Sequence, residues 1–209
     1  MMDKSKKHII HSRPKFGRLV STPDNTRFLD RRERRLILGV TASIAIYKAC
    51  ELIRKLKECG FTVKVIMTQE AEELIKPIVF ASLSGNRVYR AGIFDEPDTW
   101  EIEHVSLAQE ADLILIAPAT ANIIAKLAAG ICDDLLTCTV CANKAKVLIA
   151  PAMNEFMYNN KITQSNITKL KSCGYKFIAP RKGVLACGKV GLGCLAEPED
   201  IVKEVKKYL

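Results

Sequence analysis

Short apolar runs alternate with longer amphipathic segments along most of the chain. The short runs are continuous enough to be strands buried on both faces, and we expect them at 36–40, 61–67, 112–117, 147–150 and 175–178. The longer segments have helical spacing, and we expect helices at 43–58, 120–129, 133–142, 162–173 and 198–208. Repeated strand–helix alternation predicts a single-domain α/β fold: a doubly wound, Rossmann-like or flavodoxin-like parallel sheet in a three-layer α/β/α arrangement.

The first 34 residues differ from the rest of the chain in charge and pattern. Residues 1–35 hold eleven basic and four acidic side chains, whereas the remainder holds 21 basic and 19 acidic ones. We therefore expect residues 1–34 to be a basic, disordered leader and residues 35–209 to form the folded domain. This leader could be a targeting peptide, a nucleic-acid-binding tail or a solvated extension. Its acidic residues favour the solvated extension.

Composition narrows the class of protein. With 209 residues, 48% of them hydrophobic, the chain can bury a substantial core. No apolar run approaches the roughly 18 residues of a membrane-spanning helix. The eight cysteines have no regular spacing, so we expect free thiols, a reducing compartment and a cytoplasmic location. We interpret Cys138 and Cys141 as small apolar residues on one helical face, and we expect no metal site.

Polar and small residues follow the ends of several expected strands. Thr41 and Ser43 come after the first strand, Thr68 after the second, and the segments 118–122 and 151–154 after two others. Each hydroxyl alone is best explained as a helix N-cap, but the carboxyl ends of parallel strands converge where ligands bind in such sheets. The first turn, GVTASIA, matches neither the dinucleotide fingerprint nor the P-loop. A single phosphate at a helix N-terminus remains compatible with it.

Two further motifs carry candidate chemistry. LACGKVGLG, at 185–193, places the Cys187 thiol in a glycine-rich loop, and PAMNEFMY, at 151–158, places the Asn154 carboxamide where a helix should begin. Taken alone, Cys187 is as well explained by packing as by function. His104, the single histidine beyond the leader, would by itself be read as an ordinary packed or surface imidazole.

Five motifs in order resemble the flavin-dependent cysteine decarboxylase family. They are GVTASIA, the EHV around His104, APATAN at 117–122, GICDDLLT at 130–137, and the pair PAMNEFMY and LACGKVGLG. The likeness extends from about Arg35 to the end of the chain, and is strongest to members that decarboxylate 4′-phosphopantothenoylcysteine to 4′-phosphopantetheine in coenzyme A biosynthesis.

The resemblance implies a role for each matching position. His104 would act in acid–base catalysis and Cys187 as proton donor, and the substrate would be bound by Asn154, Met153 and Ala186. FMN would be the cofactor, oxidising the substrate thiol before CO2 leaves and reducing the resulting enethiolate. The residues expected around FMN are Gly39, Thr41, Ser43, Thr68, Thr120, Ala121, Asn122 and Ala152.

The resemblance also implies an assembly and leaves rival functions open. Family members place the flavin where subunits meet, so we expect a homo-oligomer, a trimer or a multiple of trimers, with no nucleic-acid or membrane partner. Related proteins include peptidyl-cysteine oxidative decarboxylases, flavin prenyltransferases and phosphatase-regulatory binding proteins. Cys194-Leu195 stands where many relatives have Arg-Met, and Tyr158 where many have Trp. Many bacterial relatives continue into a synthetase domain, so the chain is expected to be either monofunctional or part of a bifunctional protein.

Overall fold

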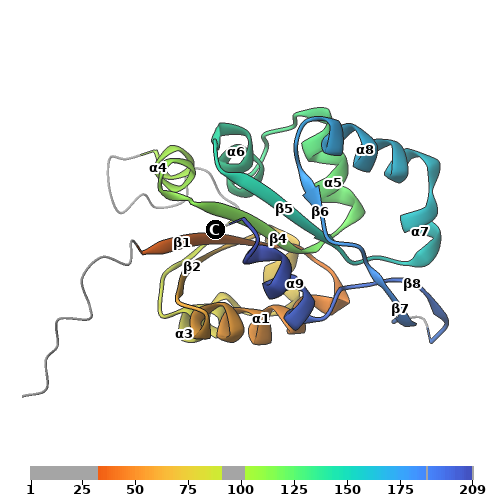
Figure 1. Ribbon diagram of the computed structural model, residues 1–209, viewed down its shortest axis with the longest axis horizontal. Helices are drawn as coiled ribbons and strands as arrows, with labels where there is room; N and C mark the ends of the chain where they lie inside the picture. The colour runs from red at the N-terminus through yellow and green to blue at the C-terminus, as the bar shows by residue number, and fades with distance from the viewer. Residues whose placement is uncertain (1–32, 91–101, 187, 209) are drawn as a thin grey trace, which may run out of the picture. The chain divides into compact units, whose positions relative to one another are not determined.

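A computed structural model describes residues 33–90, 102–186 and 188–208. Its main feature is a six-stranded parallel sheet with the strand order β3-β2-β1-β4-β5-β6 (Figure 1). The strands are β1 (Arg34–Val40), β2 (Phe61–Met67), β3 (Val88–Tyr89), β4 (Leu113–Ala119), β5 (Lys146–Pro151) and β6 (Lys176–Phe177). The expected doubly wound α/β fold is therefore confirmed.

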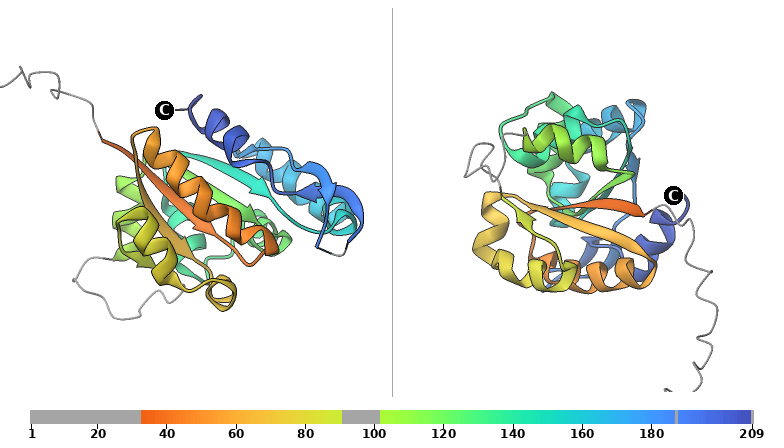
Figure 2. Two further views of the ribbon diagram at one scale, coloured as in Figure 1. Left: turned by 90° about the horizontal axis from the view of Figure 1, so that it is seen from below. Right: turned by 90° about the vertical axis from the view of Figure 1, so that its left-hand side faces the viewer.

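Helices cover both faces of the sheet, which lies between them as the middle layer (Figure 2). One face carries α1 (Tyr47–Glu58), α2 (Gln69–Leu74), α3 (Pro77–Ser84) and α9 (Pro198–Val205). The other carries α4 (Glu103–Glu110), α5 (Ala121–Ala129), α6 (Leu135–Ala142) and α8 (Lys161–Ser172). Side chains alternate along each strand: Leu36 and Leu38 of β1 belong to the first core, and Ile37 to the second.

The structure confirms the expected long elements and adds short ones that periodicity did not indicate. The helix expected at 43–58 begins as a 3-10 turn, η2 (Ile44–Ile46), before α1. Helices α2 and α3, strand β3 and an antiparallel hairpin of β7 (Arg181–Val184) and β8 (Val190–Cys194) were not expected. The leader predicted at 1–34 lies almost wholly outside the described residues, so its disorder stays a prediction. No helix in the described part of the chain is long and apolar enough to span a membrane.

The strand order reverses between β1 and β4, and a side chain joins them there. The Thr41 hydroxyl donates to the Pro118 carbonyl at 2.8 Å and accepts from the Thr120 N–H at 3.1 Å. Only 1% of Thr41 is exposed. In doubly wound sheets, a crevice for ligands opens beyond the strand ends at this reversal. The Thr41 bridge therefore fixes the two turns that border the crevice.

Candidate functional site

A cavity of about 500 Å³ lies beyond the carboxyl ends of β1, β4 and β5. Its walls come from the turn into η2 and α1, the start of α5, the segment after β5, helix α7 (Glu155–Asn159) and the β7–β8 hairpin. This volume lies within the usual range for small-molecule sites. The cavity therefore joins three of the sequence motifs, GVTASIA, APATAN and PAMNEFMY, with the segment that carries LACGKVGLG.

Hydroxyl groups at two helix starts line the cavity. Ser43 caps η2, where its Oγ accepts from the Ala45 N–H at 3.3 Å, and Thr120 caps α5, where its Oγ1 accepts from the Ile123 N–H at 3.4 Å. Both residues lie in the cavity wall together with Ala121. Ser43 and Thr120 therefore cap helices and also line the cavity, because the helices that they cap begin at the cavity.

Four of the residues expected around the cofactor do not line the cavity. Thr41 is buried in the bridge described above, and Thr68, 8% exposed, precedes α2. Asn122 is exposed on α5. At Gly39, a Cβ atom would lie 2.7 Å from Leu136 Cδ1 of α6, so the glycine permits close helix–sheet packing. Thr41 therefore supports the wall through Pro118 and Thr120, and the cofactor contacts expected of all four residues stay predictions.

The residues expected to bind substrate are better placed. Met153, Asn154 and Ala186 all line the cavity, as does the buried Ala152. The Asn154 Oδ1 atom accepts from the Phe156 N–H at 2.9 Å and so caps α7. Cys187 lies outside the described residues, but its neighbour Ala186 belongs to the cavity wall. The PAMN segment and the loop therefore meet in one cavity.

Two hydrogen bonds tie residues 153–155 to β8, a link that the sequence analysis missed. The Met153 N–H donates to the Gly193 carbonyl at 3.0 Å, and the Leu192 N–H donates to Glu155 Oε1 at 3.1 Å. A Cβ atom at Gly191 would lie 2.5 Å from Glu155 Oε2. The alternating glycines of GLG were the available signal, because glycines two apart on a strand allow another backbone to approach one face.

His104 does not line this cavity. It lies half-buried near the start of α4, which packs against α6. In Figure 1, α4 and the β7–β8 hairpin lie at opposite ends of the view. Within one chain, the structure therefore does not bring His104 together with Asn154.

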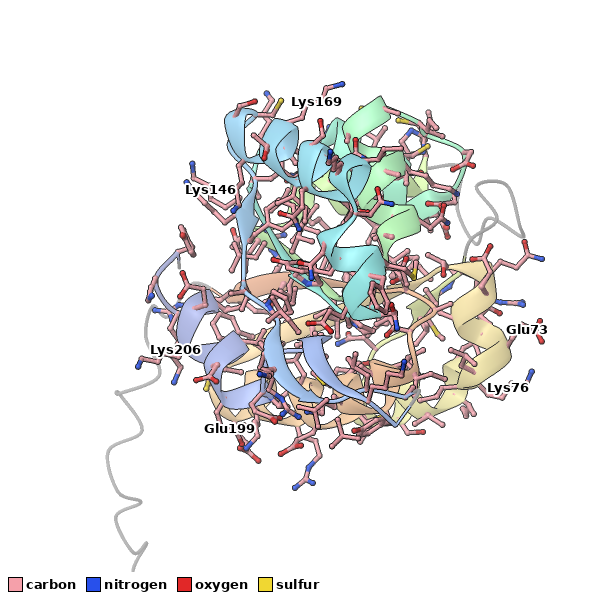
Figure 3. The ribbon with its side chains drawn as sticks, turned by 90° about the vertical axis from the view of Figure 1, so that its right-hand side faces the viewer. Glu73, Lys76, Lys146, Lys169, Glu199 and Lys206 are labelled. Atoms are coloured by element: carbon pink, nitrogen blue, oxygen red, sulfur yellow. The ribbon has the colours of Figure 1, made fainter. Side chains whose placement is uncertain are left out.

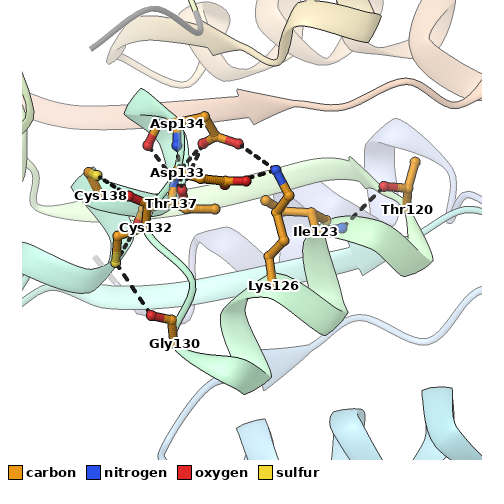
Figure 4. A network of polar contacts seen from close by, with 9 residues as sticks. All are labelled: Thr120, Ile123, Lys126, Gly130, Cys132, Asp133, Asp134, Thr137 and Cys138. Atoms are coloured by element: carbon orange, nitrogen blue, oxygen red, sulfur yellow. Dashed lines mark hydrogen bonds and ion pairs between the residues drawn. The ribbon is translucent and has the colours of Figure 1, made fainter.

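The GICDDLLT motif forms a polar network at the start of α6 (Figure 4). Asp134 and Thr137 make a capping box, and Lys126 of α5 contacts Asp133 at 2.9 Å and Asp134 at 3.3 Å. The network fixes the loop between α5 and α6, which explains the motif without a direct role in chemistry.

Two cysteines near this loop have raised thiol pKa values. Desolvation, aided by a hydrogen bond with Cys141, raises the pKa of Cys132 to about 11, and desolvation also raises the pKa of Cys138. Such thiols are protonated at neutral pH and are poor nucleophiles. Cys141 is exposed rather than packed as an apolar residue. Among the residues that the structure describes, no group of His, Cys, Asp or Glu could hold a metal ion.

Two charged residues of the cavity wall were missed by the sequence analysis. They are Lys48, the second residue of α1, and Arg181, the first residue of β7. Figure 3 views the molecule from the side on which the hairpin lies. No motif contains either residue, so only the fold reveals that they belong to the same cavity.

Comparisons with known proteins identify the family of the chain. A family model described as Flavoprotein matches residues 25–209. The bifunctional coenzyme A biosynthesis protein CoaBC of Bacillus subtilis is 50% identical over 175 residues, which cover 84% of this chain and 43% of that protein. A "Probable phosphopantothenoylcysteine decarboxylase" of Streptococcus mutans is 44% identical over 178 residues, covering 84% of this chain and 99% of that protein.

A solved structure gives the same result at the level of the fold. It is a cysteine-to-serine variant of PPC decarboxylase complexed with pantothenoylaminoethenethiol, and it superimposes with a TM-score of 0.76 at 31% identity. The match covers 85% of this chain and 98% of that one. The chain thus spans less than half of the bifunctional relative and nearly all of the other two proteins.

Proposed function

The chain belongs to the Flavoprotein family, and on that premise we propose that it is an FMN-dependent phosphopantothenoylcysteine decarboxylase. The observation that carries the proposal is that Asn154 and Ala186 line the same cavity as the helix starts at Ser43 and Thr120. Relatives that bear this activity match over most of the present chain. The synthetase activity of bifunctional relatives is not part of the proposal.

The cavity wall has the chemistry that FMN requires. Backbone N–H groups at the starts of η2 and α5, with the hydroxyls of Ser43 and Thr120, suit a phosphate group. The small side chains of Ala121 and Ala152 leave room for a flat ring against the sheet edge. We therefore assign these four residues to the cofactor, and Thr41 supports the wall through its bonds to Pro118 and Thr120.

The remaining motif residues supply binding and proton transfer. When bound, FMN accepts the hydride that converts the substrate thiol into a group able to stabilise loss of CO2. Asn154, held by its cap on α7, donates its amide N–H groups to the substrate carboxylate, and His104 accepts or donates protons. Cys187 would supply the proton, and the reduced flavin the hydride, that together convert the enethiolate left by decarboxylation into the product. An ordinary thiol with a pKa of about 8.5 remains an acid at neutral pH.

Substitution of Cys187 separates this activity from peptidyl-cysteine oxidative decarboxylation. Because a serine hydroxyl is a far weaker acid, Cys187→Ser should still release CO2 but accumulate a species two hydrogens lighter than 4′-phosphopantetheine. Mass spectrometry of quenched reactions detects that species. The exposed Cys173 at the end of α8 gives a control, and Cys173→Ser should make 4′-phosphopantetheine normally. If Cys187→Ser makes 4′-phosphopantetheine at the normal rate, another group supplies the proton. If the unmodified protein stops at the enethiol, the protein is better explained as a peptidyl-cysteine decarboxylase.

The position of His104 bears on the expected homo-oligomer. Within one chain, α4 is remote from the cavity, so His104 can act only if another subunit supplies it. A closed ring of three subunits, in which α4 of each faces the cavity of the next, would complete every site. This assembly is the one expected from family members that place the flavin between subunits.

Mixed oligomers test this arrangement. His104→Asn and Asn154→Asp subunits should each be nearly inactive alone, but co-assembly in equal amounts should restore roughly a quarter of the sites, because each site takes the two residues from different subunits. Activity is measured after co-expression with two affinity tags, and light scattering gives the subunit number. As a control, a chain that carries both substitutions is co-assembled with a His104→Asn chain. This mixture should regain no activity. Failure of the first mixture to regain activity, or a monomeric active protein, would contradict shared sites.

A further inference from the structure

The charged side chains in the cavity wall have one sign. Among the described lining residues, Lys48 and Arg181 are the charged ones, and no carboxylate lines the cavity. The other lining residues are apolar, small or neutral, including Tyr47, Met157 and Val184. A positively charged end in an otherwise neutral cavity indicates an anionic group on the ligand.

Glu197, the residue before α9, holds both cations in place. Lys48 Nζ lies 2.6 Å from Glu197 Oε2, and Arg181 Nε lies 2.7 Å from Glu197 Oε1. The Lys48 side chain is only 14% exposed, compared with 42% for each of the other two. One carboxylate therefore fixes two cations from different elements beside the cavity, and their cluster keeps a net positive charge.

A phosphate monoester is the anion that this cluster fits. It carries a charge of about −1.5 to −2 at neutral pH and offers three acceptor oxygens. A carboxylate carries a single negative charge and offers two acceptor oxygens, so it would offset only one of the two cations. An Arg and a Lys together supply a planar fork and a compact charge, the pair commonly used for phosphate.

The position of the cluster favours the substrate phosphate over that of the cofactor. Arg181 begins the strand that leads into the Ala186 loop, which is the substrate side of the cavity, whereas the helix starts at Ser43 and Thr120 suit the FMN phosphate. We propose that Lys48 and Arg181, held by Glu197, form the subsite for the 4′-phosphate of the substrate and select phosphorylated over unphosphorylated pantothenoylcysteine. The inference rests on the proposed function and adds the residues that set its specificity.

The test compares kcat/KM for 4′-phosphopantothenoylcysteine and pantothenoylcysteine in the FMN-loaded protein. Arg181→Gln should lower the preference for the phosphorylated compound about tenfold or more, the effect of losing one charge-assisted contact. Lys182→Gln is the matched control: it removes the same charge from the next residue of β7, which is exposed and does not line the cavity. Lys182→Gln should leave the preference unchanged. Equal loss in both variants would indicate a general charge effect and overturn the subsite.

Two binding measurements separate the other outcomes. FMN affinity, followed by flavin fluorescence, should be the same in Arg181→Gln and the unmodified protein, and weaker FMN binding with an unchanged substrate preference would assign the cluster to the cofactor instead. Calorimetry should show that 4′-phosphopantetheine binds more tightly than pantetheine, with the difference reduced in Arg181→Gln. If that difference is present but neither cysteine compound is decarboxylated, the subsite stands and the proposed reaction fails.

Discussion

Asn154→Asp is expected to lower kcat/KM for decarboxylation of 4′-phosphopantothenoylcysteine by roughly a hundredfold or more, the usual effect of removing an essential donor from a site. The change removes the amide N–H groups and places a negative charge in the cavity wall beside the expected substrate carboxylate. Two such charges about 4 Å apart repel by about 4 kcal/mol near a protein surface. The fold should be preserved, since Asp caps a helix as well as Asn does, and Asn154 Oδ1 caps α7 through the Phe156 N–H.

Asn160 offers a control with nearly identical geometry. It caps α8, where its Oδ1 accepts from the Ile162 N–H at 2.9 Å, and it does not line the cavity. Asn160→Asp should therefore leave both the melting temperature and kcat/KM unchanged. Steady-state CO2 release, with thermal unfolding of both variants, makes the comparison. Near-normal turnover by Asn154→Asp would remove Asn154 from carboxylate binding, and a large effect of Asn160→Asp would show that the assay responds to helix capping alone.

Gly193→Ala is expected to cost about 2–4 kcal/mol of unfolding free energy, the sum of a backbone strain and a weakened hydrogen bond. Gly193 has a φ of 146°, which L-residues rarely adopt, and its Cβ atom would overlap the Met153 carbonyl oxygen. To avoid that overlap, β8 would have to move away from the PAMN segment and weaken the bond between the Met153 N–H and the Gly193 carbonyl. Substrate turnover should fall with stability, because the same contact joins two walls of the cavity.

Gly60→Ala separates the strain from the overlap. Gly60, just after α1, has a φ of 83°, but apart from its own chain neighbours no atom of the described residues lies within 4 Å of the position that its Cβ would take. Its replacement should cost only about 1–2 kcal/mol, the penalty for the left-handed conformation. Urea unfolding of the FMN-loaded proteins gives both values. Equal costs would show that the contact between Gly193 and Met153 does not constrain the hairpin.

Periodicity was sufficient for the elements that are stabilised by the core. Strand β2 runs from Phe61 to Met67 as expected, and α5 begins after its Thr120 cap. The hairpin could not be predicted in this way, because β8 reads VGLGC and glycine is unfavourable in strands. It is a strand because it pairs with β7, and Met153 and Glu155 bond further groups of its backbone. The contacts to Met153 and Glu155 are tertiary information.

The candidate site was predictable where strand ends place residues and unpredictable where side chains converge from distant segments. Ser43, Thr120 and Asn154 lie at the cavity because parallel strands end on one edge. Thr41 also follows a strand end, yet its hydroxyl bonds to Pro118 and Thr120 within the protein and does not line the cavity. Lys48 and Arg181 have no local signal, since they meet only through Glu197, which precedes another helix.

The long sequence separation across β1 and β4 has a consequence for synthesis of the chain. The Arg35 N–H bonds to Asp112 and the Thr41 hydroxyl to Pro118, each across 77 residues. As the chain leaves the ribosome, β1 can pair with β2 at once, but its other edge stays open until β4 has emerged. An open apolar strand edge is the usual starting point for aggregation. Pairing of β4 with β1 covers this edge and also creates the ligand crevice. A nascent chain is therefore prone to associate with other chains until its ligand crevice has formed.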